Sequence, residues 1–360
     1  MNLRRESSAE GSGHADCGRP RRGGTAIGAL HECAWFMLLS LLMASCGGEA
    51  DYGHPASPSG FGADAGAGGD AGAEPAEQCS GSETDAAETP PWATWPMPNP
   101  SSSGLPNPAR YDTGKLGVVI DQVTGLMWQR ETPAEYGFAD AAALCAELAL
   151  AGHCDWRLPT RIELVSLVDF TLSNPTLDTT AFAAASGEYW STSALDEYRW
   201  RIGSDGATRA SKESMAPTGL ARCVRVHITH QVAEPRYQFT GQAPDDLATD
   251  RGTGLVWQRR PGTTTYSFAD AETHCAAFGG GGFRVPSMKE LQTVMDETKS
   301  ATSLIDAEVF PDFPTTANVT FWTSSPSARP GHAWFVRGAS TLAVAVDADL
   351  SAEFYVRCVR

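Results

Sequence analysis

The sequence predicts an α+β protein built from two tandem domains, each with two helices packed on an antiparallel sheet. The first observation is an internal repeat, because DQVTGLMWQR at 121–130 returns as DRGTGLVWQR at 250–259. The second is the order of elements in each copy, which is strand, two helices and then several strands. The period of about 130 residues fits a whole domain and exceeds the roughly 20–50 residues of a solenoid unit. We therefore expect domains at 111–228 and 237–360.

Further motifs recur in the same order in both copies. We call the residue at the same position of the other copy the counterpart of a residue. The recurring motifs are FAD at 138–140 and 268–270, the cysteines Cys145 and Cys275, RLPT at 157–160 and RVPS at 284–287, YWSTS at 189–193 and FWTSS at 321–325, and RCVR at 222–225 and 357–360.

Two segments with different composition precede the domains. Residues 34–46 form an apolar run that is too short to span a bilayer and has the shape of a signal peptide. Its last four residues, MASC, resemble a bacterial lipobox, so we predict a lipoprotein signal peptide at 1–46, with an over-extended start, and lipid on Cys46. Gly47 follows in place of an aspartate, which favours the outer membrane, facing the periplasm or the surface.

The segment 47–110 is rich in Gly, Ala, Ser, Pro and Asp and has almost no large aliphatic residues. Such a segment buries too little apolar surface to offset its ordering entropy. We therefore predict a disordered tether, with Trp92 and Trp95 near its end docking onto the first domain.

Each domain begins with a hairpin and two helices. Val118–Asp121 and 126–130 are predicted strands joined by a turn at Thr124-Gly125. A helix is predicted at about 139–150. The next helix is marked by a capping box, a Ser or Thr followed three residues later by Glu, at Thr160 and again at Ser287. Strands are then expected around Trp190 and Trp200, around their counterparts Trp322 and Trp334, and at the closing segments 221–226 and 354–359.

Six cysteines follow Cys46, and an even number in an exported chain indicates disulfides. A pairing that works inside each copy explains why the cysteines recur. It gives Cys145–Cys223 and Cys275–Cys358, and leaves Cys79–Cys154 as the third bridge. Zinc is the competing interpretation, but the sequence has no CxxC motif and no histidine with a histidine counterpart. We therefore predict neither a metal nor a cofactor.

The formal net charge is −16. Nucleic acids and other polyanions are bound through clusters of Lys and Arg that displace counterions. The acidic balance thus argues against a nucleic-acid partner and fits a soluble, exported protein.

Taken together, TGLMWQR, the FADA helix with its cysteine, DWRLPT, YWSTS and RCVR resemble the C-terminal domain of the Legionella collagen-like protein. The resemblance covers both repeats and implies a surface-exposed binding module, as in an adhesin. RLPT-x-x-E with a closing RCVR is also similar to the formylglycine-generating enzyme and sulphatase-modifying family. That similarity implies a C-type-lectin-like fold for each domain, although a shared fold does not carry function.

Trp190, Trp200, Trp322 and Trp334 are the candidate ligand contacts, because aromatic rings stack on sugars. Burial in the core is the favoured interpretation, since two copies with different ligands would still share a core. Glu163 and Glu290 already have a structural role in the capping boxes, and the sequence shows no nucleophile placed with a base.

The sequence therefore predicts a non-catalytic lipoprotein with two binding modules, attached to the membrane by its lipid. The expected partner is a glycan, a matrix component or an envelope protein. Two alternatives remain, a structural envelope protein without a small ligand and an enzyme of the formylglycine-generating type.

Overall fold

The computed structural model describes residues 90–360, except for 133, 184, 216–217, 232–233, 244, 298–304, 312–318 and 338–343. The predicted signal peptide, Cys46, Cys79 and residues 47–89 of the predicted tether lie outside the described residues. In the part that is described, no helix is long and apolar enough to cross a membrane. We refer to 111–228 and 237–360 as the first and second repeat.

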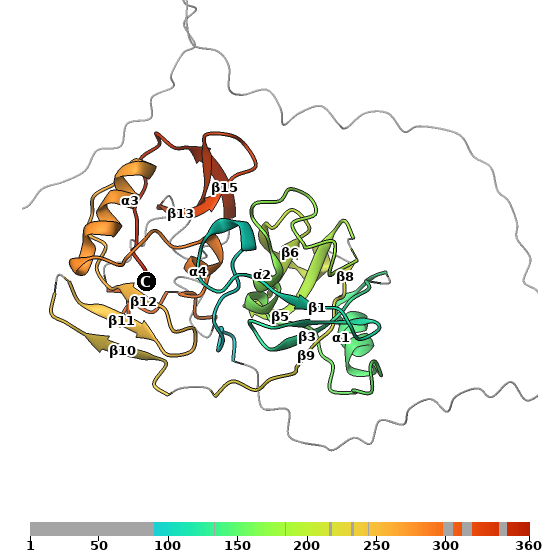
Figure 1. Cartoon of the computed structure of the whole chain (residues 1–360). Coiled ribbons are helices and arrows are strands. Elements are labelled where there is room, and N and C mark those ends of the chain that lie inside the picture. Colours follow the sequence, from blue (N-terminus) through green and yellow to red (C-terminus); the bar gives the residue numbers. More distant parts are fainter. Residues whose placement is uncertain are drawn as a thin grey trace, which may run out of the picture. The chain divides into compact units, whose positions relative to one another are not determined.

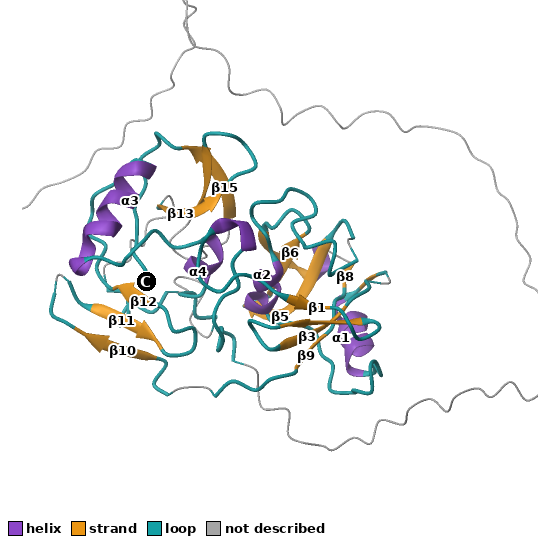
Figure 2. Cartoon of the chain, in the orientation of Figure 1, coloured by secondary structure: helices purple, strands orange, loops and turns teal. Residues whose placement is uncertain are grey.

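The first repeat divides its strands between two sheets (Figures 1 and 2). One sheet has the order β1-β2-β3-β9 and the other the order β4-β8-β5-β6-β7. Helix α1 (Phe138–Ala146) follows β4, and helix α2 (Arg161–Leu167) packs on β5 and β6. The strands are β1 (Tyr111–Asp112), β2 (Val118–Asp121), β3 (Leu126–Gln129), β4 (Glu135–Tyr136), β5 (Glu188–Leu195), β6 (Tyr198–Gly203), β7 (Thr208–Lys212), β8 (Gly219–Leu220) and β9 (Val224–Val226), with the 3-10 turns η1 (Ser101–Ser103) before them and η2 (Glu213–Met215) after β7.

The second repeat has the sheets β10-β11-β12 and β13-β14-β15. Its helix α4 packs on β13 and β14, as α2 packs on β5 and β6. The elements are β10 (Tyr237–Thr240), β11 (Leu247–Asp250), β12 (Val256–Gln258), α3 (Phe268–Ala277), η3 (Phe278–Gly280), α4 (Met288–Gln292), β13 (Thr320–Pro326), β14 (His332–Arg337) and β15 (Val344–Asp349).

The sequence predicts one antiparallel sheet per domain, and this part of the prediction is wrong. The closing segment of each repeat passes from one sheet to the other. In the first repeat Leu220 pairs with Tyr189 in parallel, and Val224 then pairs with Trp128. In the second repeat the same bridges join Tyr355 to Phe321 and Val359 to Trp257. The RCVR motif therefore lies where the chain crosses between two small sheets.

Both capping boxes are present. The hydroxyl of Thr160 accepts from the backbone N–H of Glu163, and the Glu163 carboxylate accepts from the backbone N–H of Thr160. Ser287 and Glu290 make the same reciprocal bonds at the start of α4. These bonds satisfy N–H groups that have no partner inside a helix, which explains why two such short helices begin at these residues.

Most of the core belongs to both repeats at once. One apolar cluster contains Trp128 and Leu164 from the first repeat together with Trp257 and Leu291 from the second. Two smaller clusters surround the disulfides, one in each repeat. Because the largest cluster takes side chains from both copies, the two repeats form a single packed body rather than independent modules.

Residues 90–99 of the predicted tether belong to the packed body, because each of them is buried or half-buried. Trp95 is 4% exposed and belongs to the shared core, and Asn99 is fully buried. The segment contacts the second repeat as well as the core that both repeats share. Asn99 donates to Glu290, and the guanidinium of Arg236 lies 5.6 Å from the ring centre of Trp92. A few large apolar side chains thus anchor a segment whose composition alone suggests disorder.

Candidate functional site

The motif residues of each repeat form a buried framework. Arg157 makes a bidentate ion pair with Glu163, with N–O distances of 2.8 and 2.7 Å. Arg284 and Glu290 repeat it at 2.7 and 2.8 Å. Both glutamates are buried, and each also belongs to its capping box. The pair therefore fixes the start of a helix against the last strand, because Arg157 and Arg284 also pair through their backbones with Val224 and Val359.

The first arginine of each RCVR motif, Arg222 or Arg357, is fully buried and bonds to backbone carbonyls. Arg222 donates to the carbonyls of Gln129 and Arg130, and Arg357 donates to those of Gln258 and Arg259. Buried polar groups are kept in a fold when their hydrogen bonds are satisfied. These arginines therefore hold the end of one strand in place and do not face solvent.

The structure contains the two recurring disulfides that the sequence predicts. Cys145 is bonded to Cys223, with a Cα–Cα distance of 5.4 Å, and Cys275 to Cys358, at 5.3 Å. Each bridge joins the first helix of a repeat to its closing segment. Cys154 is also disulfide-bonded, while Cys79, its predicted partner, lies outside the described residues.

The four candidate tryptophans do not form a ligand platform, so this hypothesis is wrong. Trp190 and Trp322 are fully buried, and each donates from its indole nitrogen to a backbone carbonyl, of Tyr136 or Tyr266. Trp200 is 1% exposed.

Trp334 is the partly exposed member of the set, and it faces the other repeat. Its indole nitrogen donates to the carbonyl of Phe170 at 2.9 Å, and the two rings meet edge to face. All four rings are therefore used in packing, as their recurrence in both copies suggested.

Two charged side chains that differ from their counterparts make polar contacts between the repeats. Arg161, whose counterpart is Met288, is fully buried, pairs with Glu297 and donates to the side chain of Gln292. Lys289, whose counterpart is Ile162, donates to the carbonyl of Ser166. The two copies have thus diverged into different halves of one interface.

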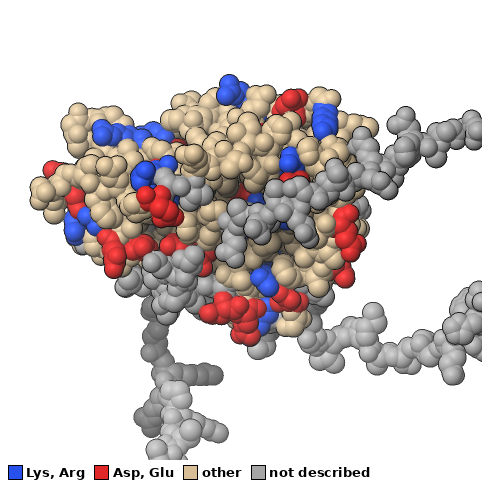
Figure 3. Space-filling view, turned by 90° about the horizontal axis from the view of Figure 1, so that it is seen from below, with Lys and Arg blue, Asp and Glu red and all other residues tan. Residues whose placement is uncertain are grey.

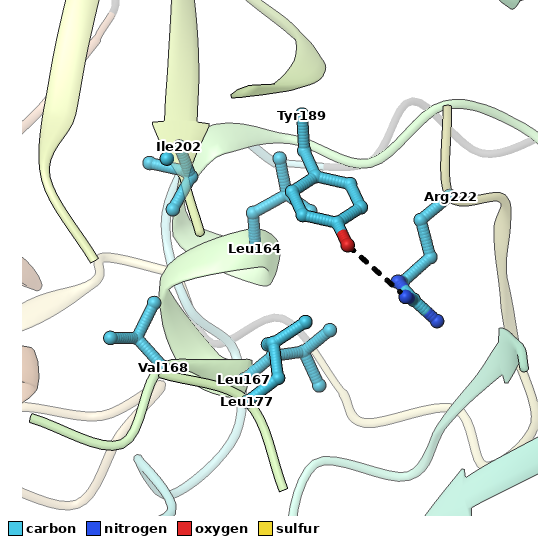
Figure 4. Close-up of a pocket in the computed structure, with 8 residues that line it drawn as sticks. Leu164, Leu167, Val168, Leu177, Tyr189, Ile202 and Arg222 are labelled. Carbon is cyan, nitrogen blue, oxygen red and sulfur yellow. Dashed lines mark hydrogen bonds between the residues drawn. The ribbon is translucent and has the colours of Figure 1, made fainter. Parts of the chain in front are cut away.

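A small cavity lies beside α2 in the first repeat (Figure 4). Its volume of about 10 Å³ has room for about one water molecule. Arg222 bonds to the Tyr189 hydroxyl at one side of it. The lining is otherwise mostly aliphatic, from Leu164, Leu167, Val168, Leu177, Ile202 and the backbone of Gly203. A space this small and this apolar is a packing defect rather than a binding pocket for a metabolite.

One surface of the first repeat departs from the shared framework. In the second repeat Trp322 pairs with Phe335, and the ring of Phe354 lies 4.6 Å from each of theirs, centre to centre. In the first repeat Trp190 pairs with Arg201, and the counterpart of Phe354 is Gly219. A Cβ on Gly219 would lie 2.6 Å from a guanidinium nitrogen of Arg201. The glycine is therefore needed to make room for the arginine.

Arg201 belongs to a row of ion pairs on this side of β5, β6 and β7. The pairs join Arg199 to Glu213 at 2.9 Å, Arg201 to Glu188 at 2.9 Å, and Arg209 to Asp205 at 2.7 Å. Glu188 also lies 3.5 Å from Arg209 and so links two of them. We call these six residues the arginine face.

Aromatic rings lie beneath the arginine face. The guanidinium carbon of Arg199 lies 4.2 Å from the ring centre of Phe138, and that of Arg201 lies 4.4 Å from that of Trp190. Burial lowers the pKa of Arg201, and the nearby Glu188 opposes that change. The hydrogen bond from Arg209 lowers the pKa of Asp205. The face is thus a charged array held rigidly on an apolar support.

The comparison with protein families gives two matches in tandem, both to the Lcl C-terminal domain, at residues 117–225 and 246–360. The two matches together cover more than half of the chain. The chain belongs to the Lcl C-terminal domain family. The recurring motifs described above, including the ion-paired helix start and the closing RCVR, lie inside both Lcl C-terminal domains. No curated protein matches the chain.

The described parts of the two Lcl C-terminal domains hold no group of three or more His, Cys, Asp or Glu side chains that could bind a metal ion. Sequence reasoning missed the arginine face, because it judged residues by whether their counterparts agree. The signal that marks this face is a difference between the two repeats. The first repeat has Arg201 and Gly219 where the second has Phe335 and Phe354. Pairing strands across the sheet was needed to see that these two changes compensate for each other.

Proposed function

We propose that this chain is a non-catalytic binding protein of the bacterial cell envelope, with C-type-lectin-like domains that act in adhesion or in recognition of a glycan or a protein. The observation that supports it most is the arginine face. Polar groups that recur in both repeats are used inside the framework, whereas the arginine face is partly exposed and specific to one repeat. Exposed polar groups held in place by a rigid sheet are a common basis of recognition.

The proposed attachment is lipid on Cys46, at the outer membrane. Residues 47–89 would then form the tether, shorter than the sequence suggested, because the packed body begins at about residue 90. A random coil of that length spans roughly 35–40 Å root-mean-square. Cys46→Ala should move the protein from the membrane fraction to the soluble fraction, and continued membrane attachment would refute the lipid anchor.

Two other functions compete with binding. An enzyme of the formylglycine-generating type needs reactive cysteines, whereas the five described cysteines, Cys145, Cys154, Cys223, Cys275 and Cys358, are all disulfide-bonded. A structural envelope protein would need no rigid charged face. The binding function and the structural alternative are separated by passing envelope fractions and glycans over immobilised full-length protein and measuring what is retained. Retention above background supports binding, and no retention of any fraction favours the structural alternative.

A further inference from the structure

The arginine face is organised before any ligand arrives. Residues that pair across neighbouring strands project from the same side of a sheet, and Arg201 pairs with Arg209 while Glu188 pairs with Gly203. Gly203 is also a site of close approach, because a Cβ there would lie 2.5 Å from a guanidinium nitrogen of Arg209. Two glycines thus allow two guanidinium groups to lie close to the sheet. Side chains fixed in this way lose little conformational entropy on binding.

The charges of the arginine face balance, with three arginines against Glu188, Asp205 and Glu213. Because Arg201 is buried, a sulphated or phosphorylated ligand would meet the carboxylates together with the partly exposed guanidinium groups of Arg199 and Arg209. Basic and acidic side chains also lie next to each other on the side of the molecule that Figure 3 shows. The arrangement therefore gives a polyanion no net attraction, since such ligands are held by excess positive charge.

A protein partner also fits this surface poorly. Protein interfaces are usually centred on exposed aromatic or apolar anchors. Here the aromatic rings of Phe138 and Trp190 are covered by the guanidinium groups of Arg199 and Arg201. The groups left open to solvent are the polar ends of the ion pairs, with side-chain exposures of 44% for Arg209 and 47% for Asp205.

Groups of this kind match hydroxyls. A hydroxyl both donates and accepts, so neighbouring hydroxyls of one ligand bond to a carboxylate and to a guanidinium at the same time. We propose that the arginine face binds an uncharged oligosaccharide. This proposal rests on the proposed binding function and assigns it a site and a ligand class. The second repeat does not share the site, because Phe335 and Phe354 fill the equivalent position.

The test uses the full chain and an array of uncharged oligosaccharides (glucans, mannans and galactans), with hyaluronan as a carboxylated probe and heparin as a sulphated one. The face variant is Arg209→Gln with Glu188→Gln, which removes one charge of each sign. The matched control is Arg329→Gln with Asp347→Asn, an exposed pair in the second repeat. Circular dichroism and the melting temperature of each variant show whether it is folded.

We expect an uncharged oligosaccharide to bind the wild type and the control equally. It should bind the face variant at least about tenfold more weakly, because the variant removes charge-assisted hydrogen bonds. Equal binding by the face variant would overturn the site and leave the binding function standing. Retention of heparin or hyaluronan alone would overturn the ligand class. Absence of binding to every probe overturns this proposal, and the proposed function falls with it only if envelope fractions are not retained either.

Discussion

Lys289, from the second repeat, makes in the first repeat the contacts that Arg236, the residue just before the second repeat, makes in the second. Arg236 donates to the carbonyl of Thr293 at 2.6 Å and to the buried carboxylate of Asp250 at 2.7 Å. The counterparts of these acceptors are Ser166 and Asp121. Lys289 donates to the Ser166 carbonyl at 2.9 Å, and its charge acts on Asp121.

In the first repeat Lys289 takes this role because Arg110, the counterpart of Arg236, is exposed. Asp121 is fully buried, which raises its pKa, and its second carboxylate oxygen has no hydrogen-bond partner among the described residues. The first repeat therefore takes its counter-charge from the second repeat. The two copies therefore differ in their roles and are not interchangeable.

Lys289→Met should lower the free energy of unfolding by about 3 kcal/mol, because it leaves the buried Asp121 carboxylate without a nearby cation. Adding Asp121→Asn should restore part of that loss. The asparagine oxygen still accepts hydrogen bonds from the backbone N–H groups of the turn, and it carries no charge. Urea denaturation of the wild type, both single variants and the double variant measures the coupling. Strictly additive losses would show that the two groups do not interact.

The stability that Lys289 confers should rise at alkaline pH. Burial lowers its pKa from 10.5 to about 8 in the folded chain. Between these two values the unfolded chain binds more protons than the folded one, so the free energy of unfolding increases with pH. The gain is at most about 3 kcal/mol. Unfolding of the wild type and of Lys289→Met, compared from pH 7 to pH 10, checks this. A difference that is constant or falls across the range would contradict the buried charge.

Trp95→Ala should destabilise the protein by about 3–5 kcal/mol, the usual loss for a large aromatic side chain in a core. Trp92, which is partly exposed, is the matched control, and Trp92→Ala should cost about 1 kcal/mol or less. Thermal unfolding of both variants measures the difference. Equal and small losses would mean that the segment 90–99 is not part of the packed body.

Asp205 should titrate below the ordinary aspartate range, because Arg209 stabilises its charged form. A lowered folded-state pKa means that the contribution of this pair is present above the unfolded value and is lost as the pH falls through the folded value. Carbon-13 NMR of the side-chain carboxyl follows this directly. Arg209→Gln should return the Asp205 pKa toward 3.8, and an unchanged titration would show that the pair is not formed in solution.

The sequence predicts the parts of the fold that depend on local or duplicated signals. The hairpins at Thr124-Gly125 and its counterpart, both capping boxes and both recurring disulfides are present as expected. Helix α1 ends at Ala146, short of the predicted 150, because the chain turns at Ala151 and Gly152, where φ is 56° and 77°, and Leu150 pairs with His153.

The relations that sequence reasoning missed depend on contacts between distant residues. The docking of Asn99 on Glu290 joins segments 191 residues apart, and the composition of 90–110 gives no sign of it. The contact between Arg161 and Gln292 has no counterpart, so a comparison of the two copies does not reveal it. The arginine face depends on Gly219 and Arg201 changing together, which is visible only once the strands are paired.

Calorimetric unfolding of the chain from residue 90 to its end tests the central claim most directly, that the two repeats form one packed body. We expect a single transition in which the calorimetric and van't Hoff enthalpies agree, because the shared core and the Lys289 contact must be lost together. Two separate transitions, each matching one repeat unfolding alone, would contradict it.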